Sequence, residues 1–448
     1  MREFRPIILL LLFVGGMFCL PPDAMYALRQ VALAATTYYV QTDGNNANAG
    51  TSVGAANAWA DPGYACSQMS NRDKCYIKAG TYTLTTTIAG EAGPIVVPAD
   101  ESHIYEGYYA TPGDKAMNGA TFSPPIIDTG GTTPGGSTYV VTLSSVTSYQ
   151  ALVMYVEVDC NDTANWNGFS IAANSLVYRA RAIDCVTGFY SGSAEEKAIE
   201  CLASSCANGF QMSATRCHAD ACGTGFYYAS WSHCLATACG YGFRAGNYNR
   251  LLNNVAYACT THSFAANGQS NVAIACISVS NSGGFAYNTD TGGEDFSLIQ
   301  CWHFNTTSGR TNGTPVYDIL GGTLSEDPFV NSAAGDFRLK PNGADYASLA
   351  GVSGVYGQTD NRDIGAVQHA DPTIVVPDAK YIYNGQTVTS NGSALVTGTL
   401  NASNISAAKG SGSNLSAGIL KKDDVVDDVT GTLEAGSGGG ETSHVWVR

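Results

Sequence analysis

The segment SATRCHADACGTGFYYASWSHCLATACGYGF, residues 213–243, contains the clearest repeat in the sequence. In this segment Cys217 and Cys234 lie 17 residues apart, and Phe226 and Phe243 repeat at the same interval. A period of 16 to 17 residues is too short for a helix pair or a propeller blade, but it suits one turn of a parallel β-helix with three short strands. The repeat therefore predicts stacked coils.

The same pattern extends on both sides of this segment. Strand-like pieces end in cysteine at eight places: VEVDC (156–160), RAIDC (181–185), KAIEC (197–201), SATRC (213–217), SWSHC (230–234), VAYAC (255–259), VAIAC (272–276) and SLIQC (297–301). The phenylalanine marker recurs at Phe169, Phe189, Phe210, Phe226, Phe243, Phe264 and Phe285. We therefore interpret 156–305 as consecutive coils of an all-β solenoid.

Side-chain alternation assigns these cysteines to the interior. Cys and the residue two before it share one strand face because side chains alternate with period two. We expect one inward column made of Cys160, Cys185, Cys201, Cys217, Cys234, Cys259, Cys276 and Cys301. Small apolar thiols fill a narrow core well, and the close C-x-x-C spacing of structural zinc sites is missing. A shorter second column follows five residues later, at Cys206, Cys222 and Cys239.

The residue before each cysteine is expected to point outward. This column reads Asp159, Asp184, Glu200, Arg216, His233, Ala258, Ala275 and Gln300. Because parallel strands stack equivalent positions, we expect Asp184, Glu200 and Arg216 to lie side by side on the solvent face. The plain interpretation is an exposed sheet on which the arginine relieves repulsion among the acids.

Both ends of the chain resemble a known family. The motifs are TTYYVQTDGNNANAGTS (36–52) with CYIKAGTYTL (75–84), YEGYYATPGDKA (105–116), SEDPFVNSAAGDFRLKPNGADYASLAGVSG (325–354) and DNRDIGAVQ (360–368). They resemble secreted right-handed parallel β-helix proteins of the pectin-lyase-like superfamily. The resemblance implies a β-helix over 36–371, with an N-terminal cap and first coils at 36–155 and closing coils at 306–371. It implies no particular activity, because this fold carries many.

The N-terminus has the pattern of a secretory signal. Arg2 and Arg5 precede an apolar run from Pro6 to Leu20, and small residues end at Ala35, so we expect residues 1–35 to be removed. The product would be secreted or cell-surface protein without a transmembrane span. A net charge of −15 argues against nucleic acid as a partner. In an oxidising compartment Cys66 and Cys75 are the preferred disulfide, with two reduced thiols as the alternative.

The C-terminal region changes composition. Residues 372–448 are rich in Gly and Ser and contain VTGTL twice, at 396–400 and 429–433. This pattern suggests two small β modules that serve attachment or oligomerisation, or else a flexible linker.

Two functions of different classes follow. The first is non-catalytic: a glycan-binding or structural β-helix that recognises a polysaccharide or surface glycan through Tyr227, Tyr228, Trp231 and Tyr241. Exposed aromatic rings offer broad contact surfaces with a polar edge, although each ring singly could equally be buried.

The alternative is a Ca²⁺-dependent polysaccharide lyase, or a glycoside hydrolase, acting on an acidic polysaccharide. By resemblance to lyases of this fold, Asp159, Asp184 and Glu200 would hold Ca²⁺. Arg216 would be the base, with Glu200 and Asp184 as further catalytic candidates. No motif of a known enzyme class accompanies these residues, so the non-catalytic reading is preferred.

Overall fold

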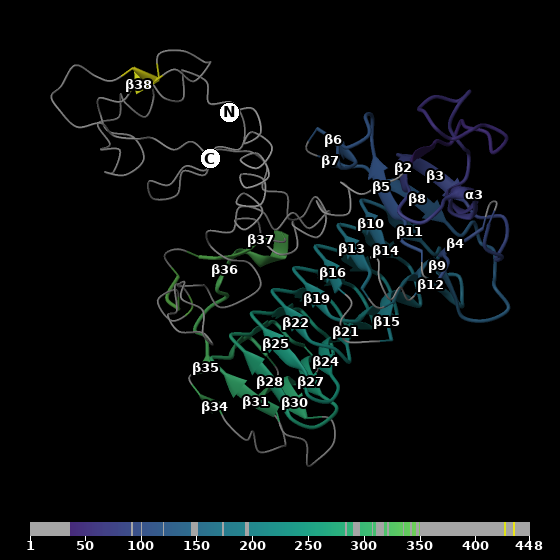
Figure 1. Cartoon of the computed structure of the whole chain (residues 1–448). Coiled ribbons are helices and arrows are strands. Elements are labelled where there is room, and N and C mark those ends of the chain that lie inside the picture. The colour runs from purple at the N-terminus through teal and green to yellow at the C-terminus, as the bar shows by residue number, and fades with distance from the viewer. Residues whose placement is uncertain are drawn as a thin grey trace, which may run out of the picture. The chain divides into compact units, whose positions relative to one another are not determined.

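Three long parallel sheets form the first of two compact units in the chain, Met1–Ile382. The computed structural model describes most of residues 36–349, with short gaps of which the longest are 145–150, 290–295 and 311–317, and the strands at 425–426 and 433–434. The expected signal segment 1–35, residues 351–371 and nearly all of the tail 372–448 lie outside the described residues. Successive strands of each sheet follow one another in rows (Figure 1).

From β2 to β33, each coil contributes one strand to each sheet in turn. Sheet A comprises β1 (Thr37–Val40), β2 (Lys74–Lys78), β5 (Ile104–Tyr108), β10 (Leu152–Met154), β13 (Leu176–Tyr178), β16 (Lys197–Ile199), β19 (Ala214–Thr215), β22 (Trp231–Ser232), β25 (Arg250–Leu252), β28 (Asn271–Ile274), β31 (Phe296–Ile299) and β34 (Asp318–Ile319). Sheet B comprises β3 (Gly80–Thr83), β8 (Pro125–Asp128), β11 (Glu157–Asp159), β14 (Arg181–Ile183), β17 (Leu202–Ser204), β20 (His218–Asp220), β23 (Leu235–Thr237), β26 (Val255–Tyr257), β29 (Ile277–Val279), β32 (Trp302–Phe304) and β35 (Gly322–Thr323).

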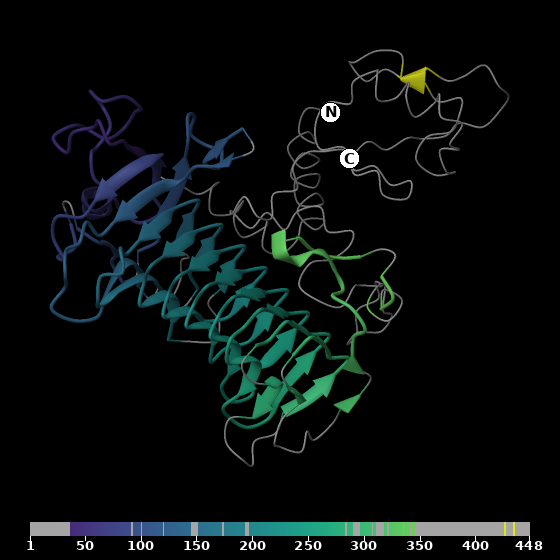
Figure 2. The same ribbon diagram turned by 180° about the vertical axis from the view of Figure 1, so that it is seen from behind.

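Sheet C closes the coil on its third side. It comprises β4 (Ile95–Val97), β9 (Thr138–Leu143), β12 (Trp166–Ile171), β15 (Thr187–Ser191), β18 (Asn208–Gln211), β21 (Thr224–Tyr227), β24 (Tyr241–Ala245), β27 (His262–Ala266), β30 (Phe285–Thr289) and β33 (Ser308–Arg310). All pairings within the three sheets are parallel, as the view from behind also shows (Figure 2). The chain is thus a right-handed parallel β-helix, which confirms the predicted fold class.

The turn from sheet A to sheet B, which we name the A/B corner, is nearly constant. From β13 to β32, one residue with positive φ and one inward residue separate the last residue of the sheet A strand from the first of the sheet B strand. The left-handed residues include Arg179, Glu200, Arg216 and His233, at φ of 49° to 55°. Such backbone costs about 1 kcal/mol or more per non-glycine residue, so the parallel ladders on both sides must hold it.

A column of stacked rings runs along the interior face of sheet C. Phe169, Phe189, Phe210, Phe226, Phe243 and Phe264 stack in order, with ring centroids 4.6 to 5.0 Å apart. Tyr287 continues the stack at 5.1 Å, whereas Phe285 lies two residues earlier in β30. The glycine before most of these rings is required, because a Cβ on Gly209 would lie 2.5 Å from the carbonyl oxygen of Gly225.

The cysteines are buried as predicted, but the predicted main column of eight is divided between two corners of the coil, and three of its members lie with the shorter column. Cys201, Cys217, Cys234, Cys276 and Cys301 lie at the A/B corner, after sheet A strands. Cys160, Cys185, Cys206, Cys222, Cys239 and Cys259 lie after sheet B strands, at the turn to sheet C that we name the B/C corner. Apart from Cys160, which directly follows β11, the cysteines at both corners come after a strand and one left-handed residue, so the sequence pattern alone does not distinguish the two corners.

The N-terminal end carries a short helix, α3 (Pro62–Gln68), whose Asp61 side chain caps the Tyr64 amide. The expected Cys66–Cys75 disulfide is absent. Cys66, on α3, lies 3.9 Å from Nδ1 of His103, and Cys75, on β2, is fully buried and not bonded. Burial raises the pKa of the Cys66 thiol to about 11, so packing holds both side chains as neutral thiols.

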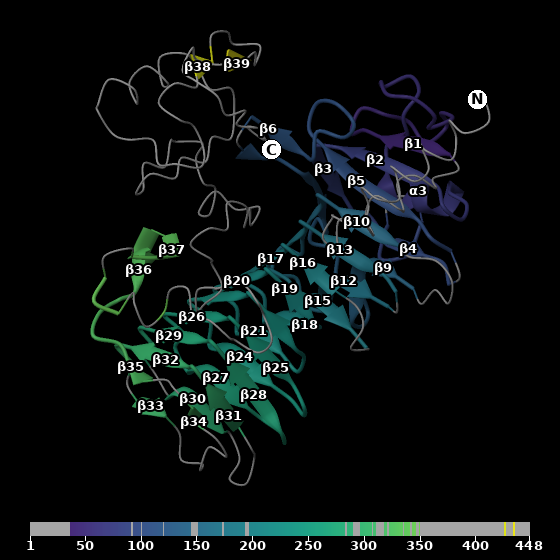
Figure 3. The ribbon, with the colours of Figure 1, turned by 60° about the vertical axis from the view of Figure 1, so that its left-hand side comes forward.

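Sheet B is covered on its outer face by a later part of the chain. After β35 the chain forms an antiparallel pair, β36 (Phe329–Asn331) and β37 (Asp336–Leu339), with the 3-10 turn Ser332–Ala334 between them. Apolar side chains of this closing segment form one buried cluster with the outward residues of sheet B: Leu324, Phe329, Phe337, Leu339 and Leu349 with Leu235, Val255, Ile277 and Val279. Figure 3 shows the pair beside β20, β26 and β29.

In the second unit, Tyr383–Arg448, the described residues form one antiparallel pair, β38 (Val425–Val426) with β39 (Leu433–Glu434). In neither unit does a described helix have the length and apolar character needed to cross a membrane.

Candidate functional site

The A/B corner holds a buried carboxylate between two guanidinium groups. Glu200 is 5% exposed, and its Oε2 accepts a hydrogen bond from Nε of Arg179 at 2.6 Å. Its Oε1 lies 3.6 Å from Nη1 of Arg216. The Tyr178 hydroxyl donates to Oε2 at 3.3 Å. These residues meet because the constant corner places one left-handed residue of each coil above the next.

The pKa shift in this group is that of a structural ion pair rather than of a catalytic base. Burial lowers the pKa of Arg179, but the Glu200 carboxylate more than compensates, so the pKa lies above its ordinary value. Burial also raises the pKa of Tyr155 to about 12. The guanidinium and the phenol therefore keep their protons at neutral pH, and neither can act as a base there.

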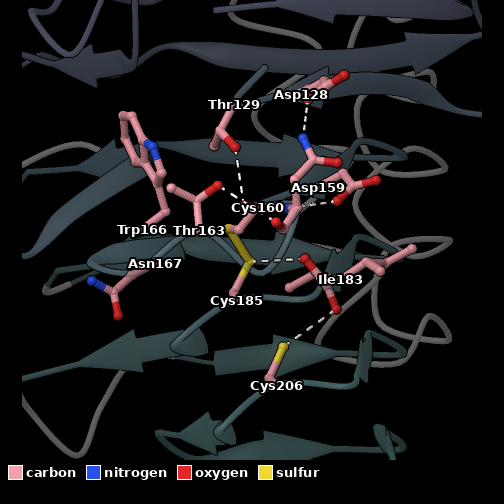
Figure 4. Close-up of a disulfide and its surroundings, with 12 residues drawn as sticks. Asp128, Thr129, Asp159, Cys160, Thr163, Trp166, Asn167, Ile183, Cys185 and Cys206 are labelled. Carbon is pink, nitrogen blue, oxygen red and sulfur yellow. Dashed lines mark hydrogen bonds between the residues drawn. A yellow bond between two sulfur atoms is a disulfide. The ribbon is translucent and has the colours of Figure 1, made fainter. Parts of the chain in front are cut away.

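The B/C corner has the opposite character, because acids gather there without a described arginine among them. Asp184 lies at this corner, and its pKa is raised by partial burial and by the nearby carboxylates of Asp162 and Asp159. The backbone amide of Asn161 donates to Asp159 at 2.9 Å, and its side chain donates to Asp128. Figure 4 shows Asp128 and Asp159 beside the Cys160–Cys185 disulfide.

The predicted row of outward residues is therefore divided between two corners. Glu200 and Arg216 lie together, but Glu200 is buried rather than on the solvent face, and Asp184 is at the B/C corner and does not join them. The pairing of Ile183 with Ser204 aligns Asp184 with Ser205 instead of Glu200. The proposed Ca²⁺ ligands Asp159, Asp184 and Glu200 are divided in the same way. Within the described ranges, no three His, Cys, Asp or Glu side chains are grouped to hold a metal ion.

The outer face of sheet C carries a group of aromatic and polar side chains. The Arg244 guanidinium lies over the rings of Tyr227 and Tyr241, 5.8 and 5.1 Å from their centroids. Tyr241 packs edge-on against His262, at 5.4 Å between centroids, and His262 stacks on Phe285 at 6.1 Å. We name Tyr227, Tyr228, Tyr241, Arg244, His262 and Phe285 the sheet C aromatic face.

Three of the four predicted sugar-binding aromatics belong to this face. Tyr227 and Tyr241 are half-buried at the ends of β21 and β24, and Tyr228 follows β21 with 42% of its surface exposed. The Tyr227 and Tyr228 rings stack at 3.8 Å, and the Tyr228 hydroxyl accepts a hydrogen bond from Asn267. Trp231 was predicted wrongly: it is 2% exposed in the core, and its indole N–H donates to the Met212 carbonyl at 3.0 Å.

Sequence reasoning missed Arg244, His262 and the pair of Tyr139 and Tyr190. The last two rings stack at 5.6 Å, and burial raises the pKa of Tyr139 to about 12. A signal was present, since the outward residues of sheet C stand one position after and two positions before each inward phenylalanine. The predicted outward column was instead defined by the cysteines, which follow strands of sheets A and B.

The chain matches no family model and no curated protein. Solved structures with a similar fold include a rhamnogalacturonan lyase (15% identity, 62% of this chain and 75% of that chain, TM-score 0.39) and pectate lyase Pel9A (14%, 75% and 96%, 0.39). A double mutant of the tailspike protein of E. coli bacteriophage HK620 is also similar (10%, 68% and 62%, 0.35). At such identities and TM-scores these likenesses carry no conclusion about this chain, and the parallel β-helix is established by its own strand pairings.

Proposed function

We propose that the protein binds a polysaccharide on the sheet C aromatic face. The observation that carries this proposal is the position of Arg244 over Tyr227 and Tyr241, with Tyr228 exposed beside them. Aromatic rings cover the apolar faces of sugar rings, and phenol, guanidinium and amide groups at their edges hydrogen-bond with hydroxyls.

Neighbouring polar groups extend this surface along the sheet. Gln211 occupies the outward position on β18, and on β30 Asn288, which is only 7% exposed, contacts Nε2 of His262 at 3.2 Å. Strands lie about 4.8 Å apart, so the face from β18 to β30 spans about 19 Å along the helix axis. This length and composition suit a glycan of several residues rather than a monosaccharide.

The test is the binding of the full chain to a glycan array and to immobilised polysaccharides. Tyr227→Ala and Tyr241→Ala should each weaken binding about tenfold, which corresponds to about 1.4 kcal/mol. Tyr109→Ala is the matched control, since Tyr109 is 37% exposed on an N-terminal loop away from sheet C, and it should bind as wild type does. Wild-type protein that retains no polysaccharide, or a Tyr109→Ala variant equally impaired, would refute the proposal.

A second candidate function is hydrolysis of that glycan at the B/C corner. The raised pKa of Asp184 beside the carboxylates of Asp159 and Asp162 favours it. Glycoside hydrolases use two neighbouring carboxyl groups of unequal pKa, one protonating the leaving oxygen and the other acting as nucleophile or base. The corner lies immediately before the sheet C strands, so a glycan on sheet C would pass close to it.

An assay for reducing ends, carried out on the polysaccharide that binds best, distinguishes hydrolysis from binding alone. Asp184→Asn should abolish turnover and leave the affinity unchanged if Asp184 is the acid. Products absorbing as unsaturated uronates would instead indicate a lyase, for which Arg216→Ala is the corresponding variant. Binding without any product leaves the non-catalytic function.

We also propose that the protein functions outside the cytoplasm. The Cys160–Cys185 disulfide supports this location, because disulfides persist in oxidising compartments. Detection of the chain in the culture medium or on the cell surface tests the proposal, and retention in the cytoplasm would contradict it.

A further inference from the structure

The interior of the β-helix contains more sulfur than its one disulfide uses. Nine cysteines in the two corner columns are buried thiols: Cys201, Cys217, Cys234, Cys276 and Cys301 at the A/B corner, and Cys206, Cys222, Cys239 and Cys259 at the B/C corner. The polar partners of their sulfurs are mostly backbone carbonyl oxygens, such as that of Asp220 for Cys222 at 3.5 Å. Neither candidate function uses these thiols.

The existing disulfide shows that neighbouring coils can be cross-linked at a corner. Cys160 and Cys185 belong to consecutive coils, and their Cα atoms lie 5.0 Å apart. That separation is within the range of about 4.4 to 6.8 Å that disulfides require. Figure 4 shows Cys206 on the next strand along, directly after this pair.

Strand register places the remaining thiols of the B/C corner directly opposite one another, whereas Cys160 lies one position before the level of Cys185. Ser204 pairs with Asp220, Asp220 with Thr237, and Thr237 with Tyr257. Two residues further along, the same register aligns Cys206, Cys222, Cys239 and Cys259 one coil apart. Adjacent parallel strands are about 4.8 Å apart, which again suits a disulfide.

Direct contacts support this alignment. The amide of Cys201 lies 3.4 Å from Sγ of Cys217, and the Cys222 thiol hydrogen-bonds with those of Cys206 and Cys239. At the A/B corner the register of Thr215 with Ser232 aligns Cys217 with Cys234. The pairing of Ile274 with Ile299 aligns Cys276 with Cys301 in the same way.

We propose that the two columns carry four further inter-coil disulfides when the chain folds under oxidising conditions. At the B/C corner, pairing of all four thiols requires Cys206–Cys222 and Cys239–Cys259. At the A/B corner Asn254 stands where another cysteine would be, because its coil lies between those of Cys234 and Cys276. Cys276 therefore pairs with Cys301. Cys217 pairs with Cys201 or Cys234, and one thiol remains.

Each cross-link is a two-electron oxidation. Two thiols lose two protons and two electrons as the S–S bond forms, and a small-molecule or protein disulfide accepts the electrons and becomes two thiols. All nine sulfurs are buried in the folded chain, where no oxidant in solution can reach them, so the reaction must occur while the coils are still open. In the folded state burial raises the pKa of Cys259 to about 12, which leaves almost no thiolate to react.

Thiol counting on the full chain tests the proposal. The chain is refolded with oxidised and reduced glutathione, denatured and alkylated with iodoacetamide, then reduced and labelled with N-ethylmaleimide before peptide mapping. Eight of the nine thiols should carry N-ethylmaleimide, and one of Cys201, Cys217 and Cys234 should carry the acetamide group. Acetamide on all nine would overturn the proposal, and so would cross-links between the two corners.

Two single substitutions should change the number of alkylated thiols in the columns in opposite directions. Cys234→Ala should lower the number of alkylated thiols in the columns from one to zero, because Cys201 and Cys217 then form a complete pair. Cys206→Ala should raise it from one to two, with the new thiol at the B/C corner. An unchanged count in both variants would refute pairing by position, and circular dichroism would confirm that each variant is folded.

Discussion

The A/B and B/C corners have the same backbone and opposite electrostatics. In most coils each has a left-handed residue followed by a buried residue, which is usually a cysteine. At the A/B corner Glu200 lies between Arg179 and Arg216 and is buried, whereas at the B/C corner Asp184 lies near two other acids and is partly exposed. The comparison shows that the inward residue maintains the coil and that the left-handed residue before it determines the surface chemistry.

The largest effect should come from removing the A/B carboxylate. Glu200→Ala leaves the Arg179 guanidinium, 20% exposed, without its 2.6 Å partner, and should cost about 3–5 kcal/mol in the free energy of unfolding. Arg216→Ala is the control: its side chain is 37% exposed and 3.6 Å from Glu200, so it should cost about 1 kcal/mol or less. Urea unfolding measures the free energy of unfolding of both variants. An equal loss in Arg216→Ala would show that the exposed Arg216 contributes as much as the buried contact of Glu200 with Arg179.

The interior of the two corners should respond alike. Cys217→Leu at the A/B corner and Cys239→Leu at the B/C corner each add volume to a fully packed column, and each should cost about 1–3 kcal/mol in reducing buffer. Alanine at the same positions separates overpacking from the loss of sulfur. A leucine tolerated at only one corner would show that the two columns are packed differently.

Neutralising the B/C acid should have a small effect of the opposite sign. The pKa of Asp184 is raised in the folded state, so ionisation opposes folding at neutral pH, and the penalty disappears as pH falls below the ordinary Asp pKa. Asp184→Asn should therefore stabilise the fold by less than about 0.5 kcal/mol at pH 7 and by nothing near pH 3. Thermal unfolding at both pH values measures this, and a loss of stability at pH 7 would contradict it.

The smallest change concerns one hydrogen bond. The Ser205 side chain hydrogen-bonds with Asp184 and lowers the pKa of its carboxyl, against the raising effects of burial and charge. Ser205→Ala should raise that pKa further by less than about one unit, with the backbone unchanged, since alanine already occupies the left-handed position at Ala221 and Ala238. Carboxyl NMR titration measures the shift, and an unaltered pKa would remove Ser205 from the network.

The fold was predictable from the sequence because a period of 16 to 17 residues with two inward markers fits few architectures. The site was predictable only in part. Asp184 and Glu200 both precede a cysteine, and nothing in that local pattern states which sheet the strand belongs to. Only pairing partners such as Ser204 for Ile183 distinguish the corners. Trp231 was misplaced for a similar reason, since a single aromatic residue fits either face of a two-residue strand.

The constant A/B corner has a consequence for how such a chain can change in length. Ala198 pairs with Ala214, so residues 198–213 make one complete rung, and its ends meet its neighbours in the same geometry. Copying or deleting that stretch would lengthen or shorten the molecule by one strand spacing and leave every other contact in register. The rung, rather than the single residue, is the natural unit in which this protein can grow.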